Sequence, residues 1–289
     1  MRLLAGRYRL VEPVGRGGTA VVWRAVDELL NRRVAVKMLA PRLAHDPQSR
    51  ALIRAEAQIA AQLNHPHVAN VYDYGEARAG GPRRVPYLVL EFVDGETLAG
   101  RLHRRGALEW PEAVRICADV AAALAATHAS GLVHRDVKPS NVLLSPAGVK
   151  LVDLGIALAV GAESANSRGE VRGTPSYMAP EQLAGGAAVP ASDVYAFGLV
   201  LYACLSGRAL RRTDGTRPEP VDPEVAVRGL GAAPEEVRQL CRRCLTPAPA
   251  DRPTSAEVAR LLAGVAGIPA ATGSAALASP AVTGNAAVA

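Results

Sequence analysis

The sequence predicts an α+β fold of two lobes, in which a small antiparallel sheet with one helix precedes a larger, mainly helical lobe. Over the first 92 residues, short apolar runs alternate at strand spacing and turn residues separate them. After Gly95 the apolar residues recur at helical spacing instead. With 289 residues, 49% of them apolar, the chain is long enough to build both cores. We therefore expect a first lobe at about 7–92 and a second at about 93–263.

The first lobe is expected to contain five strands and one helix. The apolar runs predict strands at 8–11, 20–23, 34–36, 68–74 and 87–92. Between the third and fourth strands, residues 49–63 show helical periodicity, with one apolar face formed by Ile53, Ala57, Ala60 and Leu63. This helix should end before Pro66, because a proline restricts the residue that precedes it to extended conformations.

The second lobe is expected to consist of helices around two short strands. Helical spacing predicts helices at 98–103, 111–130, 179–183, 193–206, 234–245 and 255–262. Strands are predicted at 142–144 and 149–152, whereas the Pro-, Gly- and Arg-rich stretch 209–230 favours no firm helix. The last 26 residues, 264–289, carry no charged side chain and are rich in Ala, Gly and Pro, so we predict a disordered tail.

Composition narrows the classes of function. The net charge is +6, from 33 basic and 27 acidic residues that are interleaved along the chain, so we expect no nucleic-acid partner. The four cysteines lie in apolar, helix-like runs and are interpreted as small buried residues, with a metal or redox site at Cys241 and Cys244 as the alternative. No run of 18 apolar residues and no signal peptide is found, so we expect no membrane span in this chain and a cytoplasmic location.

Lysine is rare in this chain. Three of the 33 basic residues are lysines (Lys37, Lys138 and Lys150), and the other thirty are arginines. In such a chain a retained lysine indicates a site that requires a compact ammonium group and not a planar guanidinium. Lys37 and Lys138 lie in the motifs described below, whereas Lys150, beside a predicted strand, is interpreted as ordinary.

The most informative segment is 134–141, which reads HRDVKPSN. It places the carboxylate of Asp136, the ammonium of Lys138 and the carboxamide of Asn141 on one loop, which Pro139 keeps from being helical. Together these groups are equipped to receive a hydroxyl proton, neutralise a phosphoryl oxygen and hold a metal ion. The segment resembles the catalytic loop of protein kinases. Over about residues 7–263 the chain resembles a bacterial eukaryotic-like serine/threonine protein kinase, so its two lobes are expected to form a protein-kinase-like fold.

The resemblance implies an ATP site between the lobes. Gly15, Gly17 and Gly18 stand where kinases cover the phosphates, with Ala20 in place of the third glycine; a tight hairpin is the simpler interpretation of the glycines alone. The resemblance also assigns Lys37, paired with Glu56 of the predicted helix, to the α- and β-phosphates. The adenine is expected to lie among Val22, Ala35 and Leu143 and to bond the backbone from Glu91 to Val93.

The resemblance further implies a metal site and a chemical mechanism. Asp153, in a DLG segment that matches the kinase DFG with leucine for phenylalanine, is expected to bind Mg²⁺ together with Asn141, with Mn²⁺ as an alternative ion. Asp136 would orient the substrate hydroxyl and accept its proton, while Lys138 offsets charge on the γ-phosphate.

Several further residues have structural or regulatory roles in the family. By similarity, Thr174 bonds Asp136 and Lys138, which is the serine/threonine pattern; Glu181 forms a buried pair with Arg252; and Asp193 accepts backbone hydrogen bonds from the catalytic loop. Arg135 would meet a phosphate on the long loop that follows Gly161, with Ser164 and Ser167 as candidate acceptors. An unmodified loop is the alternative.

Two other functions compete with a protein kinase that phosphorylates Ser and Thr hydroxyls, including its own. A non-catalytic scaffold of the same fold usually lacks one of the four residues Lys37, Asp136, Asn141 and Asp153, and this chain has all four. Small-molecule phosphotransferases of related fold lack the protein-docking segment 174–181, which is present here. Homodimerisation through the first lobe is a further hypothesis, and the substrates and any continuation into a membrane helix or sensor are not determined by the sequence.

Overall fold

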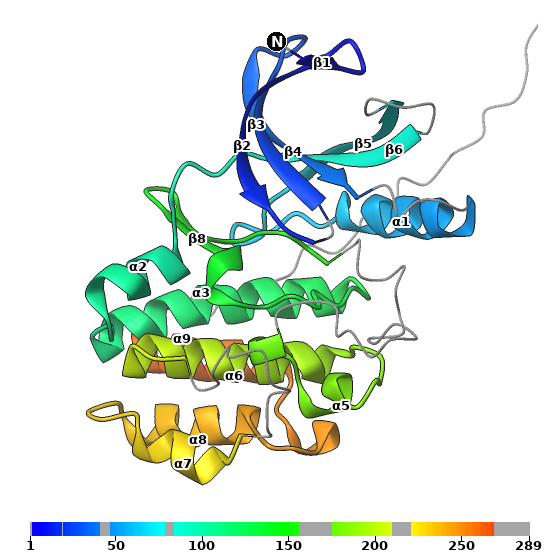
Figure 1. Cartoon of the computed structure of the whole chain (residues 1–289). Helices are drawn as coiled ribbons and strands as arrows, with labels where there is room; N and C mark the ends of the chain where they lie inside the picture. Colours follow the sequence, from blue (N-terminus) through cyan, green and yellow to red (C-terminus); the bar gives the residue numbers. More distant parts are fainter. Residues whose placement is uncertain are drawn as a thin grey trace, which may run out of the picture.

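The computed structural model describes residues 2–18, 20–40, 47–78, 84–155, 175–209 and 221–268, which form the two predicted lobes (Figure 1). The first lobe is a curled six-stranded sheet with strand order β1-β2-β3-β4-β6-β5, in which every neighbouring pair is antiparallel. Its strands are β1 (Arg2–Leu4), β2 (Tyr8–Arg16), β3 (Ala20–Asp27), β4 (Arg32–Leu39), β5 (Val71–Arg78) and β6 (Arg84–Glu91). The sequence did not predict β1, which has only three residues.

Helix α1 (Pro47–Ala60) lies beside the sheet of the first lobe (Figure 1). It buries Ile53, Ala57 and Ala60, which belong to the apolar face that the sequence predicted. These side chains form one cluster with Leu39 of β4 and Leu88 of β6. Burying an apolar stripe of this kind is what fixes the position of an amphipathic helix, so α1 is held at the sheet by packing.

The second lobe is a helical layer below the sheet (Figure 1). Its helices are α2 (Leu98–Arg105), α3 (Trp110–Ala129), α5 (Pro180–Leu183), α6 (Pro190–Ser206), α7 (Pro223–Arg228), α8 (Glu235–Cys244) and α9 (Ser255–Ala266). Helix α3 packs against α6 and α9, and α6 is buried along most of its length. Helix α7 lies in the stretch for which no firm helix was predicted, and its six residues are too few to show periodicity.

The last helix extends beyond the predicted end of the second lobe. Helix α9 continues to Ala266, and Gly267 ends it in a left-handed conformation with φ of 66°. Residues 264–266 therefore belong to a helix, although the sequence assigned them to the tail. Residues 269–289 of that predicted tail lie outside the described residues.

A three-stranded sheet lies at the junction of the two lobes. It consists of β7 (Glu96–Thr97), β8 (Val142–Ser145) and β9 (Gly148–Leu151) in the order β7-β8-β9. Strand β8 is labelled between the lobes in Figure 1. The segment Pro139–Asn141 forms one turn of 3-10 helix and leads directly into β8. Because Asn141 precedes β8 and Asp153 follows β9, this small hairpin sets the spacing of the two predicted metal ligands.

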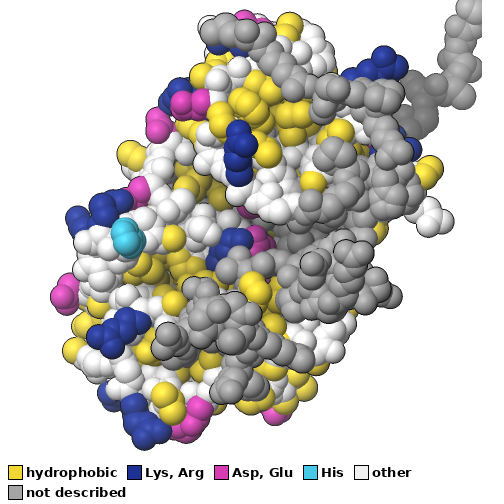
Figure 2. All heavy atoms as spheres, viewed as in Figure 1, with side chains coloured by type: hydrophobic (Ala, Val, Ile, Leu, Met, Phe, Trp, Pro, Cys, Tyr) yellow, Lys and Arg dark blue, Asp and Glu magenta, His cyan; other side chains and the backbone are white. Residues whose placement is uncertain are grey.

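The four cysteines, Cys117, Cys204, Cys241 and Cys244, are free and fully buried in helices α3, α6 and α8. Burial raises the pKa of the Cys241 thiol to about 12, so this thiol is protonated and unreactive at neutral pH. None of the helices in the described part of the chain combines the length and the apolar character needed to cross a membrane. On the face shown in Figure 2, basic side chains are scattered over both lobes among acidic ones.

Candidate active site

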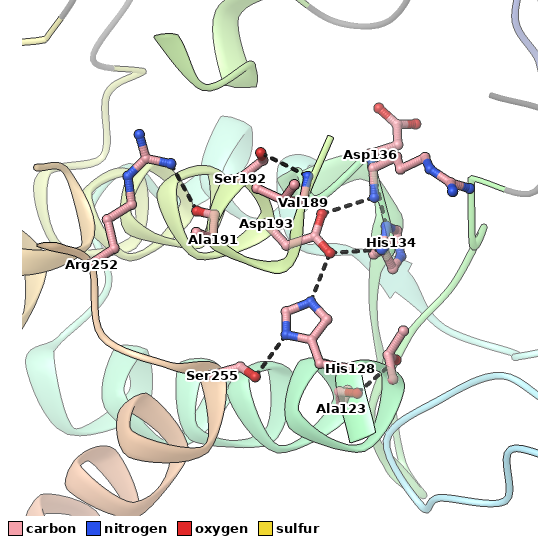
Figure 3. Close-up of polar contacts among 12 residues, drawn as sticks. Ala123, His128, His134, Asp136, Val189, Ala191, Ser192, Asp193, Arg252 and Ser255 are labelled. Atoms are coloured by element: carbon pink, nitrogen blue, oxygen red, sulfur yellow. Dashed lines mark hydrogen bonds and ion pairs between the residues drawn. The ribbon is translucent and has the colours of Figure 1, made fainter. Parts of the chain in front are cut away.

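The buried carboxylate of Asp193, near the start of α6, holds the loop that leads to Asp136 (Figure 3). Its Oδ2 accepts a hydrogen bond from the backbone N–H of His134 at 2.7 Å, and its Oδ1 accepts one from the backbone N–H of Arg135 at 2.8 Å. Nε2 of His128, on α3, lies 2.9 Å from the same Oδ2, and its Nδ1 lies 2.8 Å from Oγ of Ser255 on α9. Three helices of the second lobe therefore fix the backbone just before Asp136.

The three polar groups of the loop meet at the carboxylate of Asp136. Nζ of Lys138 lies 2.9 Å from Oδ1 and 2.7 Å from Oδ2. Nδ2 of Asn141 donates to Oδ2 at 2.9 Å and to the Asp136 carbonyl at 2.8 Å. Charge-assisted bonds of this kind hold a carboxylate in one orientation. Asp136 is thus oriented by the two neighbours that the motif supplies.

His134 joins this loop to the segment that carries Asp153. The backbone N–H of Asp136 donates to Nδ1 of His134 at 3.3 Å, and Nε2 lies 3.1 Å from the carbonyl of Val152. Burial lowers the pKa of His134, so the ring is neutral and these partners place its proton on Nε2. The N–H of Gly155 also donates to the His134 carbonyl at 2.9 Å. These bonds keep the proposed base and the proposed metal ligand side by side.

Lys37 and Asp153 form an ion pair between the lobes. Lys37, on β4, is only 4% exposed, and its Nζ donates to Oδ1 of Asp153. Burial acts to raise the pKa of Asp153, but the charge and the hydrogen bond of Lys37 outweigh it, so the pKa is lowered. Asp153 adopts a left-handed φ of 67°, which is costly for a residue with a side chain and is typical of functional sites. The pair satisfies a lysine that would otherwise be buried without a partner.

The predicted ion pair between Lys37 and Glu56 is not present, and that prediction was wrong for this structure. The carboxylate of Glu56 is bound instead by Nη1 of Arg135, at 2.9 Å from Oε1 and 3.1 Å from Oε2. Each buried charge is still paired, because Asp153 replaces Glu56 beside Lys37. Burial raises the pKa of Glu56 and Arg135 only partly offsets this, which shows that the carboxylate lies in a poorly hydrated position.

The glycines at the end of β2 leave room above the sheet. Neither Gly15 nor Gly17 has a positive φ, and a Cβ atom would come no closer than 3.7 Å and 4.0 Å, respectively, to other heavy atoms. The fold therefore does not require glycine at either position. Glycine at such positions allows a ligand to approach the backbone closely. Gly18 is described, but its neighbour Thr19 is not.

The residues assigned to adenine lie on strands that meet at the junction of the lobes. Val22 on β3 is the register partner of Lys37 on β4, and Ala35 precedes Lys37 by two residues on the same strand. Leu143 lies on β8 of the small sheet, and Glu91 ends β6. Val93 follows in the connection to β7, the crossing between the lobes.

The sequence interpretation missed one polar residue of this region. Lys150, on β9, was taken as ordinary, but its Nζ lies 3.0 Å from Oε2 of Glu91 and 3.3 Å from the carbonyl of Val68. The available signal was the scarcity of lysine in the chain, which marks Lys150 as strongly as it marks Lys37 and Lys138.

Another buried ion pair stabilises the second lobe. Nη1 and Nη2 of Arg252 bind the two carboxylate oxygens of Glu181 at 2.8 Å and 2.9 Å, and the Arg252 side chain is fully buried. Its remaining N–H groups donate to the backbone carbonyls of Thr246, Ala191 and Pro247. Burial acts to raise the pKa of Glu181, but its bonds from Arg252 and Ser192 lower it. The two residues thus hold together segments 71 residues apart.

Three predicted residues, Ser164, Ser167 and Thr174, fall within 156–174, outside the described residues. Of the remaining candidates, the structure brings Lys37, Asp153, Asp136, Lys138 and Asn141 into one connected set of contacts, through His134 and the loop backbone. It places Glu56 and Arg135 next to this set as a separate pair. In Figure 2 a basic and an acidic side chain meet near the middle of the molecule, where the lobes join.

Comparison with known proteins gives one consistent family. Residues 8–261 match the model of the protein kinase domain. The chain is 44% identical over 260 residues to the serine/threonine-protein kinase PknA of Mycobacterium tuberculosis, an alignment that covers 86% of this chain and 58% of PknA. It is 42% identical over 242 residues to PknB of the same organism, which covers 79% of this chain and 38% of PknB. The chain thus spans less than two thirds of these relatives.

Solved structures agree with the sequence comparison. The crystal structure of the Mycobacterium tuberculosis PknI kinase domain superposes with a TM-score of 0.71 at 28% sequence identity, over 91% of this chain and 97% of that domain. The curled sheet and the helical second lobe are therefore the architecture of a kinase domain, as the sequence predicted.

Proposed function

This chain belongs to the protein kinase domain family, and on that premise we propose that it is a bacterial serine/threonine protein kinase. It transfers the γ-phosphate of ATP to Ser and Thr hydroxyls of proteins, its own included. The observation that carries the proposal is the cluster at Asp136, where Lys138 and Asn141 both lie within 2.9 Å of the carboxylate. Asp153 lies on the adjoining segment, joined to the loop through His134.

Asp136 orients the acceptor hydroxyl and takes up its proton. Its carboxylate is already held in place by two charge-assisted or amide bonds, so little reorganisation is needed when a substrate arrives. The ammonium of Lys138, 2.7 Å from that carboxylate, lies where it would offset negative charge on the transferred phosphoryl group. The reaction then requires positioning and charge stabilisation without a covalent intermediate.

The residues present fit a nucleotide and a magnesium ion. Gly15 and Gly17 put no side chain between the backbone and an approaching phosphate, and Lys37 supplies a buried ammonium at the same end of the sheet. The carboxylate of Asp153 and the amide oxygen of Asn141 are ligands that Mg²⁺ prefers, and Mn²⁺ takes similar ones. When bound there, the ion would neutralise charge on the β- and γ-phosphates.

Val22, Ala35 and Leu143 form the proposed apolar walls for adenine, and the backbone from Glu91 to Val93 supplies its hydrogen bonds. Their positions on β3, β4, β8 and the crossing between the lobes support this assignment. Arg135 and Glu56 act next to the chemistry by linking the catalytic loop to α1. We also propose Ser164, Ser167 and Thr174, in the segment beyond the described residues, as regulatory or positioning groups.

For partners we propose proteins with Ser or Thr acceptors, and a cytoplasmic location. Homodimerisation through the first lobe stays a hypothesis, supported by the exposed apolar side chains of Leu3, Leu29 and Leu30, which are 52%, 74% and 54% exposed. Sedimentation of the wild-type chain and of a Leu29→Ser, Leu30→Ser variant tests it. A monomer at all concentrations would exclude dimerisation.

The proposed activity is tested by incubating the purified chain with γ-labelled ATP and Mg²⁺, with protein acceptors in one set of reactions and sugars and aminoglycosides in another. We expect label on Ser or Thr of proteins, and removal of Mg²⁺ by EDTA should abolish it. Phosphosite mapping then identifies the acceptors. Label on small molecules alone would favour the phosphotransferase alternative, and no transfer would favour the scaffold.

A further inference from the structure

We propose that Lys150 is a positioning residue, which holds the adenine-binding backbone at Glu91 in a set place relative to the strand that leads to Asp153. The inference rests on the proposed function, because it concerns how that same site binds ATP. Nothing in the motifs points to it: Lys150 lies outside the catalytic loop, the glycine segment and the DLG segment.

The side chain of Lys150 crosses from one lobe to the other. It starts on β9 of the small sheet and ends between two acceptors of the first lobe, the Glu91 carboxylate at 3.0 Å and the Val68 carbonyl at 3.3 Å. Lys150 is 13% exposed and Glu91 22% exposed. An ion pair this well shielded from water is screened far less than a surface pair, so it restrains its two ends.

Glu91 is held on its other side by Asn70. Its Oε2, the atom that Lys150 binds, also accepts from Nδ2 of Asn70 at 3.1 Å and from the Asn70 backbone N–H at 3.2 Å. The backbone N–H of Glu91 in turn donates to the Asn70 carbonyl at 2.9 Å. Side chain and backbone of Glu91 are both fixed, and the Glu91 carbonyl therefore has little freedom to move before adenine binds.

The segment that carries Asn70 is itself attached to β9. The N–H of Leu151 donates to the His67 carbonyl at 2.8 Å, and the N–H of Ala69 donates to the Leu151 carbonyl at 3.0 Å. His67 Nδ1 lies 2.9 Å from the Val149 carbonyl. Val149 and Leu151, on either side of Lys150, thus bind the connection between α1 and β5 through their backbone. The ammonium of Lys150 adds a side-chain contact to the same connection.

The position of Lys150 in β9 connects these contacts to the proposed nucleotide site. Its register partner on β8 is Leu143, a proposed wall of the adenine site. Asp153, the proposed metal ligand, follows it by three residues. The β8–β9 hairpin therefore connects Lys150, which binds Glu91, to Leu143, the proposed wall of the adenine site, and to Asp153, the proposed metal ligand.

The chemistry of the site also explains why the chain keeps lysine here. The ammonium lies between a carboxylate and a carbonyl within 3.3 Å of each, a position that suits a compact group with three donors. A planar guanidinium needs more room and a different arrangement of acceptors. All three lysines of this arginine-rich chain then serve the same site, Lys37 and Lys138 at the phosphates and Lys150 at the adenine end.

The test compares wild type with Lys150→Met, Glu91→Gln and the double variant. Dissociation constants for adenosine, ADP and an ATP analogue that is not hydrolysed are measured by titration, and kcat is measured at saturating ATP. We expect Lys150→Met to raise all three dissociation constants by the same factor, about fivefold or more, with kcat within about twofold of wild type. Because both single changes break the same pair, the double variant should lose little more than either one.

Arg242→Met is the matched control. Its guanidinium pairs with Glu224 at 2.9 Å between α8 and α7 of the second lobe, and the two side chains are 44% and 62% exposed, so nucleotide affinity should not change. Unfolding temperatures without nucleotide are recorded for every variant. A lowered unfolding temperature with unchanged dissociation constants would overturn the proposal, and so would additive losses, a loss for ATP without one for adenosine, or a change in kcat alone. If the wild-type chain binds no adenine nucleotide, the proposed function itself fails.

Discussion

Arg135 and Glu56 form a two-point ion pair that ties the catalytic loop to helix α1. One guanidinium nitrogen lies 2.9 Å and 3.1 Å from the two carboxylate oxygens, and the side chains are only 23% and 12% exposed. Arg135 makes this contact from a left-handed backbone with φ of 66°, which its N–H bond to Asp193 helps to hold. The carboxylate of Glu56 is bound by Arg135, and Lys37 pairs with Asp153 instead. Both of these ion pairs connect the two lobes at the site.

Replacing Arg135 by methionine should make stability depend more strongly on pH. Without its cation, the pKa of Glu56, already raised by burial above its ordinary 4.5, rises further in the folded chain. The folded chain then binds a proton more readily than the unfolded one, so stability falls as pH rises through the raised pKa and recovers as pH is lowered toward 4.5. We expect a deficit of about 1–3 kcal/mol at pH 7, measured by urea unfolding.

The control for this change is Arg135→Met in a Glu56→Gln background. Glutamine cannot ionise. The stability that the double variant loses relative to Glu56→Gln alone should therefore be the same at pH 5 and pH 7. A pH-dependent deficit that survives in that background would show that some group other than Glu56 is responsible.

Asp136→Asn should lower turnover by about 10²–10⁴-fold, because the amide cannot accept the hydroxyl proton. Asparagine keeps the shape of the side chain, so the unfolding temperature and the affinity for ATP should change little. Initial rates of phosphate transfer to a model protein measure the effect. Transfer at a near-normal rate would exclude Asp136 as the base.

Lys37→Met should reduce autophosphorylation by at least about 100-fold and leave the fold intact. Methionine fills a similar volume in the buried strand, and the stranded Asp153 carboxylate, 31% exposed, can still be hydrated. The lost ammonium should raise the pKa of Asp153, since Lys37 makes the largest contribution to lowering it. Incubation with γ-labelled ATP measures autophosphorylation, and circular dichroism shows whether the fold is intact. An active, folded variant would refute the anchoring role of Lys37.

Arg252→Met should destabilise the second lobe by about 3–5 kcal/mol, because it leaves the Glu181 carboxylate without its cation and takes a donor from three backbone carbonyls. Denaturant unfolding measures the loss. Arg238→Met is the matched control: its pair with Glu235 lies on the surface of α8, and its removal should cost less than about 0.5 kcal/mol. Equal effects of the two changes would contradict the structural role given to Arg252.

The sequence predicted the helices and strands better than it predicted which charged side chains form ion pairs. Helix α1 could be predicted because its buried face repeats at helical spacing, and the strands because their apolar runs alternate. Helix α7 and strand β1 were missed because six and three residues carry too little pattern. The pairing of Glu56 could not be read from periodicity, since it depends on how α1 sits against the catalytic loop, a tertiary distance of a few ångströms.

For Lys150 the sequence did contain a signal, the scarcity of lysine, but its place beside a predicted strand led to its interpretation as ordinary. Its rarity as a lysine pointed to a special position, but its contacts reach Val68 and Glu91, which are 82 and 59 residues away along the chain. Only the folding of the connection after α1 onto β9 brings these groups together.

The complete burial of Cys117, Cys204, Cys241 and Cys244 has a practical consequence. A maleimide dye will not react with the native chain, so a cysteine engineered onto each lobe would be the only attachment point there. Donor and acceptor fluorophores at two such positions would report the opening and closing of the lobes in solution, without prior removal of any natural thiol.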